Sequence, residues 1–108
     1  MLESIRHDDI LELRLARPPV NALNPALIAQ LRDAVLAAPA QGARAIVLSG
    51  SPGLFSAGLD VPTLLGCDRD AMLAFWRDFN GLVGALGRCP VPTAAAITGH
   101  SPAGGAVL

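Results

Sequence analysis

The sequence predicts an α/β fold, in which β-strands and α-helices alternate along the chain. Two short apolar runs, Ala45 to Ser49 and Thr93 to Ile97, have the length and composition of strands. Each run follows a segment in which apolar residues recur every three or four positions, as they do on one face of a helix. This alternation favours crossover connections between strands.

Length, composition and charge limit the kind of protein. A chain of 108 residues holds at most one domain, and 52% hydrophobic residues favour a packed core. The net charge of -1 and the lack of lysine give no support for a nucleic-acid partner. The start of the chain has neither signal-peptide nor transit-peptide character, and no apolar run approaches the roughly 18 residues of a membrane span. We therefore expect a cytoplasmic protein with no membrane contact.

The N-terminal segment resembles a β-hairpin. From Ile10 to Leu15 leucines alternate with charged residues, which is typical of a half-buried strand. The run Glu3 to Arg6 is its expected partner, because the polar segment between them suits a turn.

The first helix is expected to begin at Asn24 and Pro25. Asparagine is a favoured N-cap and proline a favoured first helical residue. The helix should span about three turns and end before Pro39. Its apolar positions recur at helical spacing and are Leu27, Ile28, Leu31, Val35 and Leu36.

A second helix is expected from about Asp70 to Arg88, although Gly81, Gly84 and Gly87 weaken the prediction for its second half. A further helix opens near Ala103 and has only about six residues before Leu108, against a mean of roughly 11 to 12. We expect residues 1–108 to be the N-terminal part of a single longer domain, and to be inactive in isolation. Cys67 and Cys89 lie far apart without a ligand pattern, which predicts reduced thiols and no metal.

Two glycine-containing turns follow the predicted strands. They are Phe55–Asp60, after Ala45 to Ser49, and Gly99–Gly105, after Thr93 to Ile97. Glycine allows close backbone approach, and a turn that enters a helix leaves its first N–H groups without partners. Two such turns facing each other would form an oxyanion hole for a developing negative charge. Taken alone, the first turn could simply join a strand to a helix, with a buried Phe55 and a capping Asp60.

The second turn admits other interpretations. It lacks the spacing of a dinucleotide-binding Gly-x-Gly-x-x-Gly and the lysine of a phosphate-binding loop. It nearly matches the nucleophile elbow Gly-x-Ser-x-Gly, with Ser101 as the nucleophile of a serine hydrolase. Pro102 argues against that alternative, because the residue after the nucleophile must donate an N–H and proline has none.

The two turns, together with a third motif, resemble the crotonase superfamily (enoyl-CoA hydratase/isomerase). Phe55–Asp60 and Pro90–Gly105 resemble its two signature loops, and Arg17–Asn24 resembles its N-terminal turn that contacts coenzyme A. The resemblance covers all of this chain but only about the first two-fifths of a family member. Three motifs in register are far more specific than any one of them.

The resemblance implies a crotonase-like ββα spiral, incomplete in this chain, that binds an acyl-CoA thioester and stabilises its enolate. It implies that the N–H groups of Leu59 and Gly104 are the catalytic oxyanion donors. Coenzyme A is then part of the substrate, no separate cofactor or metal is needed, and the full-length protein is expected to be a homotrimer or hexamer. The implied substrate-binding residues are Ala22, Ala57, Gly58, Leu59, Asp60, Val61 and Gly104.

One position separates the branches of the family. Its hydratases carry a glutamate three residues beyond the second oxyanion glycine, where this chain has Val107. The form of the loop from Ser101 to Gly105 resembles the Δ3,Δ2-enoyl-CoA isomerase branch, whose single catalytic glutamate would lie beyond Leu108. Asp60 is expected to cap or brace its loop. We therefore predict an enoyl-CoA isomerase, and keep an enoyl-CoA hydratase and a non-catalytic crotonase-like binding subunit as alternatives.

Overall fold

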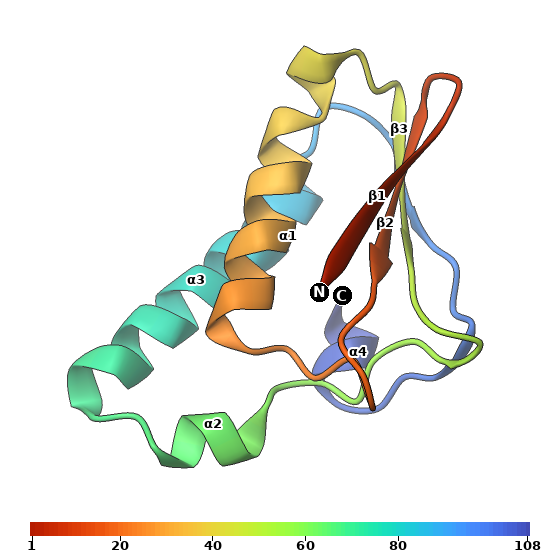
Figure 1. Ribbon diagram of the computed structural model, residues 1–108. Helices are drawn as coiled ribbons and strands as arrows, with labels where there is room; N and C mark the ends of the chain where they lie inside the picture. The colour runs from red at the N-terminus through yellow and green to blue at the C-terminus, as the bar shows by residue number, and fades with distance from the viewer.

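The computed structural model describes all residues from Met1 to Leu108 and confirms the α/β class. A four-stranded sheet has the order β1-β2-β3-β5, and helices α1 and α3 lie on one of its faces (Figure 1). Two further strands, β4 and β6, form a small separate parallel sheet. The strands are β1 (Leu2–His7), β2 (Ile10–Leu15), β3 (Ala45–Ser49), β4 (Gly53–Leu54), β5 (Thr93–Ala95) and β6 (Gly99–His100). The helices are α1 (Pro25–Ala37), α2 (Val61–Leu65), α3 (Arg69–Gly87) and α4 (Gly104–Val107), with a 3-10 turn at Pro39–Gln41.

The predicted N-terminal hairpin is confirmed. Strands β1 and β2 pair antiparallel, from Leu2 opposite Leu15 to His7 opposite Ile10. The leucines of β2 are buried, while Glu12 and Arg14 lie on the opposite face of the sheet. Alternation along one strand therefore separates a helix-covered face from a polar face.

The central strand β3 pairs in parallel with both β2 and β5, as crossover connections require. A short continuous apolar run is typical of a strand covered on both faces. In β3, however, Ile46, Leu48 and Ser49 are buried, whereas Ala45 and Val47 are only half-buried. Strand β5 ends at Ala95 instead of Ile97, and its residues are exposed. Helices α1 and α3 cover one face of the sheet only (Figure 1), which explains the half-buried residues of β3. The strand Thr93 to Ile97 was predicted two residues too long.

Helix α1 follows its local signals. The Asn24 side chain accepts a hydrogen bond from the Leu27 N–H at 2.8 Å, and Pro25 is the first helical residue. Pro39 begins the 3-10 turn that follows the helix. Leu36 is 61% exposed, so its expected place on the buried face was wrong, whereas four of the five predicted apolar positions are buried: Leu27, Ile28, Leu31 and Val35.

Helix α3 continues through all three of its glycines to Gly87. Asp68 caps it by accepting a hydrogen bond from the Ala71 N–H at 2.8 Å. Phe75 and Phe79 enter the same core as α1 and the leucines of β2. This tertiary packing outweighs the low helix propensity of glycine.

Strands β4 and β6 and helix α2 were not predicted, since each is only two to five residues long. Cys67 and Cys89 are both free thiols. No helix of the structure combines the length and the apolar character that crossing a membrane would require.

Candidate functional site

The two glycine turns meet, and their backbones are in contact. A Cβ atom added to Gly58 would lie 2.8 Å from the Gly104 nitrogen, and one added to Gly104 would lie 3.2 Å from the Leu59 nitrogen. Gly58 also has a φ of +95°, a conformation that side chains rarely adopt. A side chain on Gly58 would therefore force the two turns apart, and a side chain on Gly104 would press on the first turn.

Two backbone N–H groups at this contact have no partner. The N–H groups of Leu59 and Gly104 donate no hydrogen bond within the chain. The Gly58 carbonyl accepts from the Leu23 N–H at 2.8 Å, so the Leu59 N–H of the same trans peptide points away from Leu23. The Ala103 carbonyl likewise accepts from the Ala106 N–H, so the Gly104 N–H points out of the start of α4. The structure thus brings together the two predicted oxyanion donors.

A strained residue sets the direction of the second turn. Ala103 has φ 49° and ψ −121°, which is costly for a residue with a side chain. The chain therefore bends sharply immediately before Gly104. Strain of this kind is typical of functional turns whose geometry is held by the surrounding structure.

Ser101 has no catalytic partner. Its Oγ atom is buried and forms no hydrogen bond, and the neighbouring His100 is exposed. A nucleophilic serine needs a base within hydrogen-bonding reach. The structure therefore gives no support to the serine-hydrolase alternative.

A cavity of about 310 Å³ lies beside the first turn. Five of the seven predicted substrate-binding residues line it, and they are Ala22, Ala57, Leu59, Asp60 and Val61. The other two, Gly58 and Gly104, form the backbone contact next to it. The rest of the lining is Arg17, Pro18, Pro19, Val20 and Pro62, so the N-terminal turn and the first signature turn share one groove.

Arg17 and Asp60 tie these two turns together. An Nη atom of Arg17 lies 2.9 Å from the Asp60 carboxylate, and another donates to the Ala22 carbonyl at 2.9 Å. Asp60 also caps α2 by accepting from the Thr63 N–H at 3.3 Å. The hydrogen bond from Thr63 and the Arg17 guanidinium lower the pKa of Asp60, so its carboxylate is ionised and already paired. Its expected bracing role is confirmed.

Asn21 and Ser56 are part of the site but were not predicted. Asn21 is 1% exposed with φ 51°; its side chain accepts from the Arg17 N–H and donates to the Phe55 carbonyl. Its own carbonyl accepts from the Ser56 hydroxyl at 2.8 Å. Asparagine tolerates the left-handed conformation better than most residues, and this was the available signal in the sequence.

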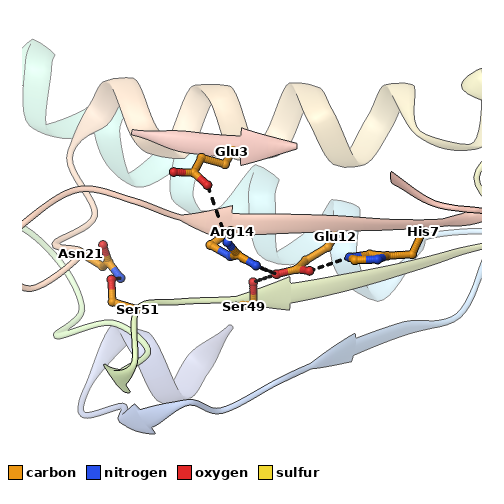
Figure 2. Close-up of polar contacts among 7 residues, drawn as sticks. All are labelled: Glu3, His7, Glu12, Arg14, Asn21, Ser49 and Ser51. Atoms are coloured by element: carbon orange, nitrogen blue, oxygen red, sulfur yellow. Dashed lines mark hydrogen bonds and ion pairs between the residues drawn. The ribbon is translucent and has the colours of Figure 1, made fainter. Parts of the chain in front are cut away.

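A second polar cluster lies on the outer face of the sheet and contains none of the predicted site residues. Figure 2 shows Glu12 between His7 on one side and Ser49 and Arg14 on the other. Hydrogen bonds from Ser49, then His7 and Arg14, lower the pKa of Glu12 to about 2. The same view places Asn21 beside Ser51, whose hydroxyl accepts from the Asn21 side chain at 3.3 Å. Every oxygen of Glu12 has a partner, so this cluster is structural.

Comparisons with known proteins agree with this geometry. The sequence profile of the family described as enoyl-CoA hydratase/isomerase matches residues 6–108. The chain belongs to this family.

Two relatives illustrate the similarity. The "Probable enoyl-CoA hydratase echA17" of Mycobacterium avium is 37% identical over 103 residues, covering 89% of this chain and 38% of the relative. The cyclohexa-1,5-dienecarbonyl-CoA hydratase of Thauera aromatica is 36% identical over 103 residues, covering 93% and 38%. The chain thus spans 38% of the length of these curated relatives.

Solved structures confirm the crotonase-like fold. Human mitochondrial delta3-delta2-enoyl-CoA isomerase superposes with a TM-score of 0.90 at 25% identity, covering 98% of this chain and 43% of that one. The enoyl-CoA hydratase from Thermoplasma volcanium gives a TM-score of 0.84 at 30% identity, covering 93% and 41%. Residues 1–108 therefore form part of the crotonase-like spiral, as the resemblance implied.

Proposed function

We propose that the protein acts on acyl-CoA thioesters and stabilises the thioester enolate with the N–H groups of Leu59 and Gly104. The observation that carries the proposal is the pair of unpartnered N–H groups at the contact of two glycine turns. Loss of an α-proton leaves negative charge on the thioester oxygen, and preorganised donors stabilise that charge. No cofactor beyond the coenzyme A of the substrate is required.

The adjacent groove suits the rest of the substrate. Its lining combines the apolar residues Val20, Ala22, Leu59 and Val61 with the Arg17–Asp60 pair. Because Asp60 is ionised and held by Arg17 and Thr63, it is not free to act as the base that moves the proton. In our proposal, a carboxylate outside residues 1–108 supplies that base.

Within this class we favour an enoyl-CoA isomerase, which transfers a proton between two carbons of the acyl chain. Val107, three residues along α4 from Gly104, supplies no carboxylate with which to position a water molecule. A hydratase is the second candidate, favoured by the names of the relatives. The third candidate is a binding subunit without catalytic activity. Whichever candidate holds, we expect the complete protein to assemble as a trimer or hexamer.

The decisive experiment follows exchange of the α-protons of butyryl-CoA with deuterated water, in the complete natural protein. Gly104→Pro removes one donor, so the exchange rate should fall by about 10² to 10³. Ser101→Ala removes a hydroxyl without partners and should leave the rate close to the wild-type value. A dead serine variant beside an active Gly104→Pro variant would contradict the proposal, and no exchange in the wild type would favour the binding subunit.

A second assay separates isomerase from hydratase. We expect the wild type to convert 3-hexenoyl-CoA to the 2-enoyl product faster than it hydrates crotonyl-CoA. Val107→Glu should raise the rate of hydration relative to that of isomerisation, because it supplies a carboxylate that can position a water molecule. Residue 107 is 56% exposed, so this carboxylate would be ionised. Ala106→Glu is the matched control, since Ala106 is an exposed neighbour on the same helix. Faster hydration in the wild type would make the hydratase the better assignment.

A further inference from the structure

Ser56 occupies the junction of the segments that form the proposed oxyanion hole. It is fully buried, and its hydroxyl has two hydrogen bonds. The hydroxyl donates to the Asn21 carbonyl at 2.8 Å and accepts from the Gly58 N–H at 3.1 Å. Since a carbonyl can only accept, the direction of this relay is fixed: Gly58 N–H to Ser56 hydroxyl to Asn21 carbonyl.

This relay holds the peptide group between Ala57 and Gly58, which precedes the Leu59 N–H donor. Gly58 adopts φ +95°, where glycine is conformationally permissive and an unrestrained peptide can rotate. Ser56 fixes the N–H of Gly58, while the Leu23 N–H fixes its carbonyl at 2.8 Å. With both ends held, the Leu59 N–H is left as the free donor of this turn.

Ser56 also sets the spacing between the turns. A Cβ atom added to Gly105, in the first turn of α4, would lie 2.3 Å from the Ser56 carbonyl oxygen. The backbone of Ser56 therefore abuts α4, while its hydroxyl holds the first turn. Its partner Asn21 is itself anchored to Arg17 and Phe55 at 2.8 and 3.0 Å.

We propose that Ser56 is a positioning residue for catalysis, whose hydroxyl orients the turn that presents the Leu59 N–H to the thioester oxygen. This role rests on the proposed function. Ser56 touches no substrate atom in this scheme and acts through Gly58 and Leu59. A misdirected donor lowers transition-state stabilisation more than it lowers substrate binding.

The test compares Ser56→Ala with Ser101→Ala in the complete natural protein. Both changes remove one buried serine hydroxyl near the site, but only the Ser56 hydroxyl has hydrogen-bond partners. In Ser56→Ala we expect kcat for 3-hexenoyl-CoA and the α-exchange of butyryl-CoA to fall by about 10- to 100-fold, with KM within about threefold. Ser101→Ala should keep wild-type kcat.

A second variant and a second measurement distinguish a local effect of Ser56 from general unfolding of the protein. Ser56→Cys nearly keeps the side-chain volume but weakens both hydrogen bonds, so its kcat should lie between those of wild type and Ser56→Ala. Hydrogen exchange of the Gly58 amide should be slow in the wild type and fast in Ser56→Ala at equal thermal stability.

Several results would overturn the role of Ser56. They are an unchanged kcat in Ser56→Ala, an equal loss in Ser101→Ala, or a rise in KM without a fall in kcat. If the wild type exchanges α-protons and Ser56→Ala exchanges them equally fast, only the role of Ser56 fails. If the wild type exchanges none, the proposed function fails and this role fails with it.

Discussion

Gly58 and Gly53 share a left-handed backbone conformation but differ in their surroundings. Their φ angles are +95° and +81°. A Cβ atom on Gly58 would press against the Gly104 nitrogen at 2.8 Å, whereas one on Gly53 would meet nothing within 4 Å. Substitutions at Gly53 and Gly58 therefore distinguish two effects. A side chain at either position strains the backbone, but only one at Gly58 presses on the second turn.

We predict that Gly53→Ala lowers the free energy of unfolding by about 1–2 kcal/mol through strain alone and leaves α-exchange intact. Gly58→Ala should lose at least as much stability. It should also slow α-proton exchange by about 100-fold or more, because its methyl group would lie between the Leu59 and Gly104 N–H groups. Urea unfolding and butyryl-CoA exchange measure the two effects. Equal exchange rates in both variants would contradict the role assigned to Gly58.

At the scale of single elements, helix α3 and strand β6 use glycine in opposite ways. In the interior of α3, a Cβ on Gly81 would meet only the Cδ of Arg32 at 3.8 Å. In β6, a Cβ on Gly99 would lie 2.0 Å from the Gly53 carbonyl carbon. Gly81 is therefore replaceable, whereas Gly99 is not.

The expected results have opposite signs. Gly81→Ala should raise the free energy of unfolding by about 0.5–1 kcal/mol, because alanine loses less conformational entropy in a helix. Gly99→Ala should lower it by more than about 2 kcal/mol, because the backbone contact with Gly53 must open. Thermal and urea unfolding of both variants would show this, and a stabilised Gly99→Ala would contradict the β4–β6 contact.

The strand pair β2–β3 carries a pH-dependent contribution to stability. The pKa of Glu12 is lowered from 4.5 to about 2 by its bonds to Ser49, His7 and Arg14. A lowered carboxyl pKa stabilises the fold above the unfolded pKa, and this contribution disappears as the pH falls from about 4.5 to about 2. Glu12→Gln should therefore be less stable than the wild type at pH 7, and the difference should vanish only below about pH 2. A constant difference over this range, in urea midpoints, would contradict the assignment.

The elements that the sequence predicted carry their own local signals. The Asn24–Pro25 cap, the alternation in β2 and the helical spacing in α1 each act within a few residues, and each was confirmed apart from the burial of Leu36. The lengths of β4, β5 and β6 depend on contacts between distant segments, which no local pattern encodes. The composition of β3 also does not reveal that helices cover only one face of this strand (Figure 1).

The candidate site also combines features that could be predicted from the sequence with features that only the fold reveals. Its two turns could be located because glycine, serine and aspartate cluster after strands, and their roles followed from a family resemblance. The hydrogen bond from Ser56 to Asn21 joins residues 35 positions apart, and Asn21 looked like an ordinary turn residue. Only the folded backbone reveals that these two side chains hold the first turn in place.

For the whole molecule, the site links three segments that are distant in sequence: the turn at 17–24, the turn at 55–60 and the turn at 99–105. A ligand held between them would stabilise the entire fold, because it would bind only when all three are in place. Crotonyl-CoA at 100 times its dissociation constant should raise the free energy of unfolding by about 2.7 kcal/mol. Differential scanning calorimetry should show the shift in wild type and a smaller shift in Gly58→Ala. A ligand that leaves the wild-type transition unmoved would contradict binding at this site.

The pairing of β4 with β6 has a consequence for how the protein matures. The hairpin β1–β2 and the helices can form from neighbouring residues, but β4 and β6 meet only after a long stretch of chain between them has closed. The gap between Gly58 and Gly104 exists only after that closure. During refolding we therefore expect helical signal to return before the contact between Gly58 and Gly104, so that the proposed oxyanion hole is among the last features that the chain acquires.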